Sequence, residues 1–340
     1  MNALFIIPAK KSLSIFKDRI VRLSAQLLIG LGAILATTAK PAQADFFFDA
    51  ATNPQILRNV HVVSIGGERT VNADSSNGQK IGISYYQLDV ASDLWNNERN
   101  QVIGGVEYDR RNFNQPVALP EGFSVPKRFD NVSASFLYKH ITSGDWSLNQ
   151  SVRYTRYRTD SSSVDMRDTI DLVGLAAMSS RPGVAWLFGY AYTQKDTVHP
   201  LLLPAVLYIN SVHSDSWTLV VGFPFLSAPF YPHPYWTLEA GSGPGASVSY
   251  KVTGQNSVQL MYSFNSWAYR LKGLNVDNVE YSAQRVSLGW SYVYAIDHRT
   301  GVVFNAGLGW EFRRRLGDGN KLSMDNAAIM GISASLVFTR

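Results

Sequence analysis

Residues 285–296 read Arg-Val-Ser-Leu-Gly-Trp-Ser-Tyr-Val-Tyr-Ala-Ile, and their side chains alternate in character. One parity holds valine, leucine, tryptophan, tyrosine and isoleucine, whereas the other begins with Arg285 and holds serine, glycine, valine and alanine. Successive side chains of a β-strand point to opposite faces, so the stretch predicts a strand with one apolar and one small or polar face. Residues 302–313 repeat the pattern, with Glu311 on the polar parity.

The length of these segments favours a membrane barrel over a soluble β-sandwich, whose strands also alternate. About twelve residues at ~3.3 Å each, tilted by ~40°, cover roughly 30 Å, the thickness of the apolar core of a bilayer. Strands of soluble sheets are usually about half as long. Similar alternation recurs at 102–108, 132–138, 148–154, 184–192 and 258–264. Because lipid leaves an open sheet edge unsatisfied, the sequence predicts an all-β, antiparallel, up-and-down transmembrane β-barrel.

The connections between these segments alternate in length. Short turns are expected at 142–145, 179–183, 253–256 and 297–300, and longer polar or proline-bearing connections at 72–79, 113–130, 159–167, 268–282 and 313–326. Short periplasmic turns and long outer loops are typical of outer-membrane barrels, whose strand number is even. Residues 195–245 contain seven prolines. If 195–215 is a long outer loop, about fourteen strands result, and fusing further short segments gives twelve.

The N-terminal segment has the features of a secretory signal. A basic stretch precedes an apolar run at 27–36, and the small-residue pattern Ala-Gln-Ala ends at Ala44, directly before Asp45. The alternative, an uncleaved transmembrane anchor, fits less well because the apolar run is shorter than the ~20 residues of a spanning helix. The expected organisation is a cleaved signal peptide at 1–44 and a barrel domain at 45–340, whose first part, 45–58, is periplasmic.

The charge of the chain follows from this segment. The first 44 residues hold six of the 31 basic residues and one of the 26 acidic residues, which leaves 25 of each sign from Asp45 onward. The mature chain is therefore neutral overall, and a nucleic-acid partner loses its main support.

Two further features resemble Gram-negative outer-membrane β-barrel proteins. The segment 217–224, Trp-Thr-Leu-Val-Val-Gly-Phe-Pro, with the aromatic and proline-rich run to Trp236, is similar to a signature of an outer-membrane barrel family of unknown function. The last alternating segment, 328–338, resembles the C-terminal signal read by the outer-membrane assembly machinery, with Phe338 as its terminal aromatic. The signal normally ends on the aromatic residue, but Thr339 and Arg340 follow here. The resemblance, over about 55–340, implies the cell outer membrane as location and no activity.

Candidate chemistry is sparse along the chain. There is no cysteine, so disulfides, thiolate metal sites and cysteine nucleophiles are excluded. His213 has serine and aspartate neighbours, but a catalytic triad assembles in space, so a solvated connection is the favoured interpretation. No His–Ser–Asn arrangement of the outer-membrane phospholipases is recognisable. We therefore expect no enzyme, no cofactor and no metal site, with a lipid-modifying enzyme as the most distant alternative.

Charged residues on the polar parities are the candidates for a barrel lumen. Two carboxylates on one face could hold a hard cation, but salt bridges to basic residues across the barrel are favoured, because an unpaired charge in a confined interior is unfavourable. The candidates are Glu107, Asp109, Lys139, Arg153, Arg285 and Glu311. They suggest a narrow porin-like channel or a binder of small polar solutes, and equally allow a structural barrel, plugged by its own side chains, that acts through its outer loops.

The run Arg313-Arg314-Arg315 is expected where a strand leaves the membrane. Arginine binds phosphate through two parallel hydrogen bonds, so the run predicts contacts with lipid A phosphates of lipopolysaccharide. An ordinary solvated loop base is the alternative. The expected partners are thus outer-membrane lipid and lipopolysaccharide, the assembly machinery and small polar solutes.

Overall fold

The computed structural model describes residues 60–120, 122–142, 146–161, 164–181, 184–194, 201–210, 219–223, 226–233, 236–241, 245–272, 278–297, 299–317 and 321–339. Every regular element in these ranges is a β-strand. No helix in this part of the chain is long and apolar enough to cross a membrane.

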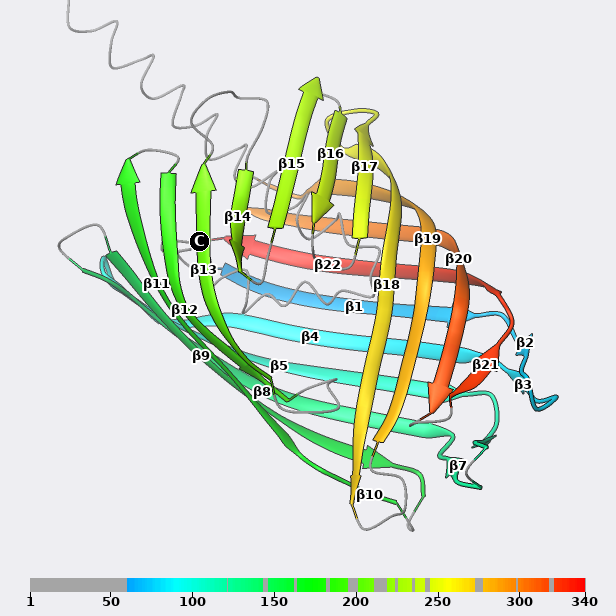
Figure 1. Cartoon of the computed structure of the whole chain (residues 1–340). Coiled ribbons are helices and arrows are strands. Elements are labelled where there is room, and N and C mark those ends of the chain that lie inside the picture. Colours follow the sequence, from blue (N-terminus) through cyan, green and yellow to red (C-terminus); the bar gives the residue numbers. More distant parts are fainter. Residues whose placement is uncertain are drawn as a thin grey trace, which may run out of the picture.

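One antiparallel ring forms the wall of the molecule (Figure 1). Of the 18 strands in the main sheet, all except β10 and β21 pair with two neighbours in the ring, which therefore has sixteen strands. They are β1 (Val60–Thr70), β4 (Ile83–Asn96), β5 (Asn100–Phe113), β8 (Arg128–Ile141), β9 (Trp146–Thr159), β11 (Thr169–Arg181), β12 (Val184–Thr193), β13 (Leu201–Asn210), β14 (Leu219–Phe223), β15 (Leu226–His233), β16 (Trp236–Gly241), β17 (Gly245–Lys251), β18 (Asn256–Lys272), β19 (Asn278–Ala295), β20 (Thr300–Gly317) and β22 (Ala327–Thr339). The last strand closes on the first, from Val60↔Thr339 to Thr70↔Ile329, so no edge is left open there.

The predicted barrel architecture is confirmed, and the predicted count of twelve to fourteen strands is wrong. The stretch 195–215, expected as an outer loop, contains β13, and the proline-rich stretch after it contains β14, β15 and β16. Successive N–H groups of an antiparallel strand point to alternate neighbours, so a proline removes one bond to one neighbour only. Pro204 thus lies within β13, opposite Tyr190, and Pro229 lies within β15.

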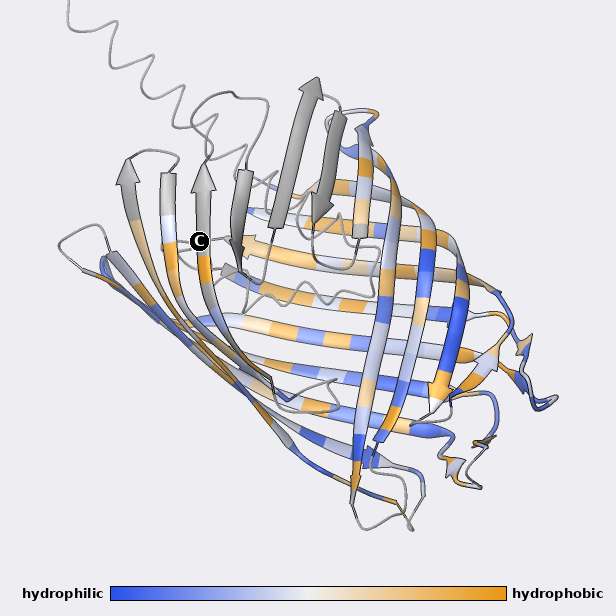
Figure 2. Ribbon diagram, viewed as in Figure 1, coloured by the Kyte–Doolittle hydropathy of each residue, from blue (hydrophilic) through white to orange (hydrophobic). Residues whose placement is uncertain are grey.

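The outer surface of the ring is apolar, as the parity analysis predicts. On β19, Leu288 and Trp290 are 55% and 43% exposed, whereas Arg285 and Ser291 on the other parity are 2% and 5% exposed. Orange and blue residues alternate along the strands in Figure 2 for the same reason. Large apolar side chains outside and polar ones inside reverse the arrangement of a soluble protein and match a lipid-facing barrel.

The connections differ between the two ends of the ring. At the end of the ring that holds Val60 and Thr339, here called the inner end, three residues join β4 to β5 and four join β17 to β18. The opposite, outer end carries short extra strands: β2 (Ala73–Asp74), β3 (Lys80–Ile81), β6 (Val117–Ala118), β7 (Ser124–Val125), β10 (Asp165–Met166) and β21 (Leu322–Met324). The short strand β10 lies in the connection from β9 to β11, yet it pairs with the outer end of β18 through Met166↔Leu271. Opposite parts of the wall therefore meet at the outer end.

Candidate functional site

The inward-facing side chains change in character from the outer to the inner end of the barrel. Along β19 they run from Tyr281 through Arg285 to Ser287 and Ser291, all at most 5% exposed. The same order occurs on β5, where Phe113 lies at the outer end and Gln101 at the inner end. The interior thus has an apolar outer layer, a charged middle layer and an inner layer in which polar side chains lie beside apolar ones such as Ile103 and Leu137.

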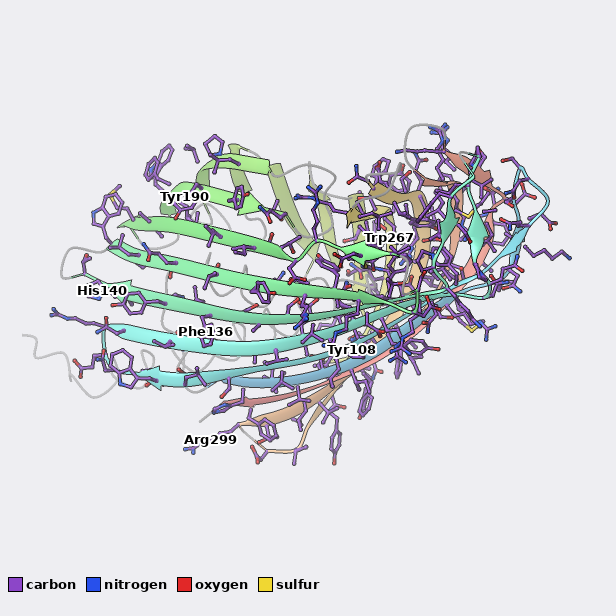
Figure 3. The ribbon with its side chains drawn as sticks, turned by 90° about the horizontal axis from the view of Figure 1, so that it is seen from below. Tyr108, Phe136, His140, Tyr190, Trp267 and Arg299 are labelled. Atoms are coloured by element: carbon purple, nitrogen blue, oxygen red, sulfur yellow. The ribbon has the colours of Figure 1, made fainter. Side chains whose placement is uncertain are left out.

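The outer layer is a packed cluster of apolar and aromatic side chains, here called the outer cluster. Its members come from opposite parts of the wall and from the outer connections, and none is more than 8% exposed: Ile81, Ile83, Phe113, Val117, Leu119, Val125, Phe129, Tyr157, Val164, Met166, Trp267, Tyr269, Leu271, Val279, Tyr281, Ala283, Leu316, Leu322 and Met324. The Phe129 ring of β8 stacks on the Tyr269 ring of β18, with centroids 4.4 Å apart and planes 4° apart. Trp267 lies among the crowded side chains at this end of the molecule (Figure 3). The outer cluster therefore joins the outer ends of β4, β5, β8 and β9 to those of β18, β19 and β20 across the interior.

Arg111 of β5 lies at the inner border of the outer cluster and is 5% exposed. Its Cζ lies 5.0 Å from the ring centre of Tyr85, 5.3 Å from that of Trp267 and 5.6 Å from that of Tyr269. Its Nη1 also donates to the Tyr269 hydroxyl at 2.6 Å. Aromatic faces attract a guanidinium group, so Arg111 joins the cluster to the charged layer below it.

The charged layer contains a bracket of ion pairs across the interior, formed by Glu68 of β1, Arg285 of β19 and Glu311 of β20. The two Nη atoms of Arg285 donate to the two carboxylate oxygens of Glu68 at 2.8 and 2.7 Å. Nη2 of Arg285 also donates to Glu311 Oε1 at 2.7 Å. Since β20 and β22 separate β19 from β1 in the ring, this ion-pair bracket spans the curvature of the wall rather than one strand pair.

Glu311 collects further partners at this level. Its carboxylate accepts hydrogen bonds from the Tyr281 hydroxyl at 2.6 Å and from Asn265 Nδ2 at 3.1 Å. Arg314 Nε lies 3.5 Å from Glu311 Oε2, and Arg314 Nη1 donates to the backbone oxygen of Asp325 at 3.1 Å. Two carboxylates and two guanidinium groups thus balance in charge, as a buried cluster requires.

All six lumen candidates lie on inward parities. Arg285 and Glu311 form the ion-pair bracket, and Asp109 accepts a hydrogen bond from the Tyr85 hydroxyl at 2.5 Å. Arg153 Nη2 lies 3.9 Å from Glu107 Oε2, so these two form a second ion pair, while Lys139 is fully buried near the inner end. Within the described residues, no group of three or more histidine, aspartate or glutamate side chains could hold a metal ion.

Sequence reasoning missed Glu68, Arg111 and Tyr281. Glu68 follows Gly66 and Gly67, which interrupt the apolar alternation of β1. The alternation of β1 could have revealed it. Glu68 lies at an even-numbered position like Val62 and Ser64, which face the interior, whereas Ile65 at an odd-numbered position is exposed on the outer face.

The inner layer contains short polar side chains beside buried apolar ones such as Leu137. Asn149, Gln259, Ser287 and Ser291 are 0–6% exposed, and each has a buried polar atom without a hydrogen-bond partner among the described residues. Buried polar groups of proteins normally have a partner, so these atoms can bind water or a polar solute.

The arginine run 313–315 is split by the structure. Arg313 has a φ of 52°, and the pairing of β19 with β20 shifts register between Ser282 and Gln284. This bulge inserts one residue and turns Arg314 inward, where it is 1% exposed, while Arg313 and Arg315 remain exposed. Arg314 is therefore inaccessible to lipid, in contrast to the prediction, because it belongs to the charged layer.

The remaining predicted positions lie at the inner end or outside the described residues. Phe338 is 36% exposed on the outward parity and pairs with His61 of β1. The signal segment, with Ala44 and Asp45 at its expected cleavage site, lies outside the described ranges. The same holds for His213.

A closed ring with an apolar outer surface decides the class of the protein. The chain has the fold of a transmembrane β-barrel. No protein-family model and no curated protein sequence matches it. Among solved structures, it is similar to a Pseudomonas aeruginosa FadL homologue, with 10% identity, a TM-score of 0.43 and coverage of 85% of this chain and 93% of that chain.

Two solved outer membrane proteins are similar to this chain to a comparable degree. An outer membrane channel from Pseudomonas putida F1 has 11% identity and a TM-score of 0.38, covering 84% of this chain and 97% of that chain. The Acinetobacter baumannii outer membrane protein Omp33 has 11% identity and a TM-score of 0.36, covering 84% and 100%. At these values no substrate or mechanism is transferred from them.

Proposed function

We propose that the protein is a narrow, gated channel or binding barrel for small polar solutes, with the outer cluster as its gate. The observation that carries this proposal is an inner layer with unpartnered polar groups beneath a packed apolar outer layer. An open diffusion pore would instead expose its charged wall residues to water along the whole axis.

The inner layer supports the solute class. Its amide and hydroxyl groups, among them Asn149, Gln259 and Ser287, offer both donors and acceptors without a fixed charge. Uncharged groups of this kind bind small polar molecules with little discrimination by charge. Lys139 is the one lysine buried near this level in the described part of the chain.

The outer cluster supports gating. Passage along the axis requires the rings of Phe129, Trp267 and Tyr269 to separate, and burial of each such side chain stabilises the closed form by roughly 1.5–3 kcal/mol. Transport would therefore need an opening step at the outer end, and the resting conductance would be low.

A plugged structural barrel that acts through its outer loops is the second candidate. The ion-pair bracket favours it, because Arg285 joins β1, β19 and β20 with four hydrogen bonds of 2.7–3.2 Å. A bracket of this kind stiffens the wall and would resist any opening of the interior.

Single-channel recording in planar lipid bilayers separates the two candidates. The double variant W267A/Y269A removes two large rings from the outer cluster, and a gated channel should then show sustained conductance where the wild type shows rare, brief openings. The matched control is W95A/Y138A, which changes the same residue types at exposed positions of the inner rim and should behave as the wild type. If W267A/Y269A folds, as judged by heat-modifiable migration, and remains silent, the barrel is plugged.

For partners, we infer that the inner end of β22 is where the assembly machinery engages the chain. The exposed Phe338 ring at the last outward position of that strand supports this inference.

A further inference from the structure

An arginine cluster lies on the outward surface of β5, β8 and β9, away from the barrel interior. It consists of Arg110, Arg128, Arg156 and Arg158, here called the outer arginine cluster. The strand registers Arg110↔Asp130↔Arg158 and Val132↔Arg156 bring these residues into adjacent rows of three neighbouring strands. Neighbouring strands are ~4.8 Å apart, so all four guanidinium groups lie within reach of one headgroup.

Exposed apolar residues begin directly on the inner side of this cluster. Val132 and Tyr154 are 48% and 44% exposed, and Val106 and Phe136 are 55% and 54% exposed. Figure 3 shows the order along the barrel, with His140 near the inner end, Phe136 in the apolar band and Tyr108 nearer the outer end. The outer arginine cluster therefore lies at the level where lipid headgroups of the outer leaflet meet acyl chains.

The contacts within the cluster hold two of its arginines in place. Asp130 accepts hydrogen bonds from Nε of Arg110 at 2.8 Å, from Nε of Arg128 and from the Tyr108 hydroxyl at 2.6 Å. Because each arginine uses Nε for Asp130, its η nitrogens can bind a second anion. The other two arginines, Arg156 and Arg158, are exposed, and no ion pair joins either of them to a carboxylate in the described part of the chain.

Carboxylates also flank the site and reduce its charge. Asp160 accepts from the backbone N–H of Arg128 at 3.3 Å, and Asp168 accepts from the backbone N–H of Tyr157 at 3.4 Å and from the Tyr154 hydroxyl. Even with Asp130, Asp160 and Asp168 counted, the four arginines remain in excess. Arginine rather than lysine at all four positions favours an oxyanion with several acceptor oxygens.

We infer that the outer arginine cluster binds the phosphate groups of a phosphorylated glycolipid of the outer leaflet, such as lipid A, whose acyl chains lie along Val106, Val132 and Tyr154. Charge complementarity and continuity with the apolar surface both point to a lipid. This site differs from the arginine run 313–315, which lies on β20, and it does not depend on passage of a solute through the barrel.

Native mass spectrometry of the full-length mature protein in mild detergent, titrated with bis-phosphorylated lipid A, tests the inference. R156Q/R158Q should bind lipid A roughly tenfold or more weakly than the wild type, since each arginine near an anionic headgroup contributes measurably to binding. R156K/R158K keeps the charges but loses the paired N–H donors of the guanidinium group, so its affinity for lipid A should lie between those of the wild type and R156Q/R158Q. R99Q/R299Q, which changes two exposed arginines in turns at the inner end, is the matched control and should bind as the wild type.

Each of four results would overturn the inference. Three of them are unchanged affinity in R156Q/R158Q, an equal loss in R99Q/R299Q, and equally tight binding of dephosphorylated lipid A by the wild type. Displacement of lipid A by millimolar inorganic phosphate alone would assign the site to free phosphate and would also contradict it. Should R156Q/R158Q fail to fold, R156K/R158K and R158Q provide the comparison. Conductance of the variants should equal that of the wild type, so this test is separate from the test of channel function.

Discussion

Arg285 and Glu68 are joined by two hydrogen bonds of 2.8 and 2.7 Å although 217 positions separate them in the sequence. Both side chains point into the barrel, with 3% and 13% of their surfaces exposed. A pair of parallel N–H···O bonds in this setting fixes the distance between two parts of the wall.

Glu68→Gln should destabilise the barrel by roughly 2–5 kcal/mol, because it leaves a buried guanidinium group with one carboxylate fewer. The matched control is Glu280→Gln, which breaks the ion pair between Glu280 and Lys321. The side chains of these two residues are 31% and 30% exposed. An exposed pair contributes about 1 kcal/mol or less. Urea-induced unfolding from lipid vesicles measures both, and equal losses would show that the bracket carries no special role in stability.

Leu308→Arg should lower the folding yield in lipid vesicles. Leu308 is 67% exposed on the outward parity of β20, and an arginine facing the middle of the bilayer destabilises a barrel by about 2–4 kcal/mol. Leu308→Ala at the same position keeps an apolar surface and should fold almost as well as the wild type. In a soluble protein an exposed leucine would tolerate arginine, so an unimpaired Leu308→Arg variant would contradict the lipid-facing assignment.

Phe338→Ala should reduce the amount of protein in the outer membrane, because it removes the large interfacial side chain at the end of β22. Removal of Thr339 and Arg340 should be tolerated, since in the described register it deletes a single pairing, that of Thr339 with Val60. Cell fractionation with quantitative blotting compares the two variants. Loss of insertion in the truncated chain together with normal insertion of Phe338→Ala would reverse the expected roles.

The mature chain should begin at Asp45. The basic stretch, the apolar run and the Ala-Gln-Ala pattern before this residue predict cleavage by signal peptidase. Intact-mass measurement of the membrane-purified protein gives the answer directly. A mass that includes Met1 would show that the N-terminal segment is retained and would remove the argument that the mature chain is neutral.

The sequence alone predicted the architecture because facing is a local property. Leu288 and Trp290 lie on one parity and Arg285 on the other, and the strand geometry converts that parity into outside and inside wherever the segment lies. The pairing of the first and last strands likewise follows from the need to close the sheet in lipid. The number of strands, in contrast, could not be predicted from local sequence. Pro204 favours a loop by composition, but β12 pairs with the segment that contains it, with Tyr190 opposite Pro204, and so makes it a strand.

The interior was decided only by the tertiary structure. Arg314 continues a run of three arginines in the sequence, yet one bulge at Arg313 turns it from the surface to Glu311. Glu68 and Arg285 meet because the ring closes, and the stack of Phe129 on Tyr269 exists because two parts of the wall approach at the outer end. Alternation determines which side of the sheet a residue faces. The curvature and register of sixteen strands determine what it meets on that side, and those depend on all pairings at once.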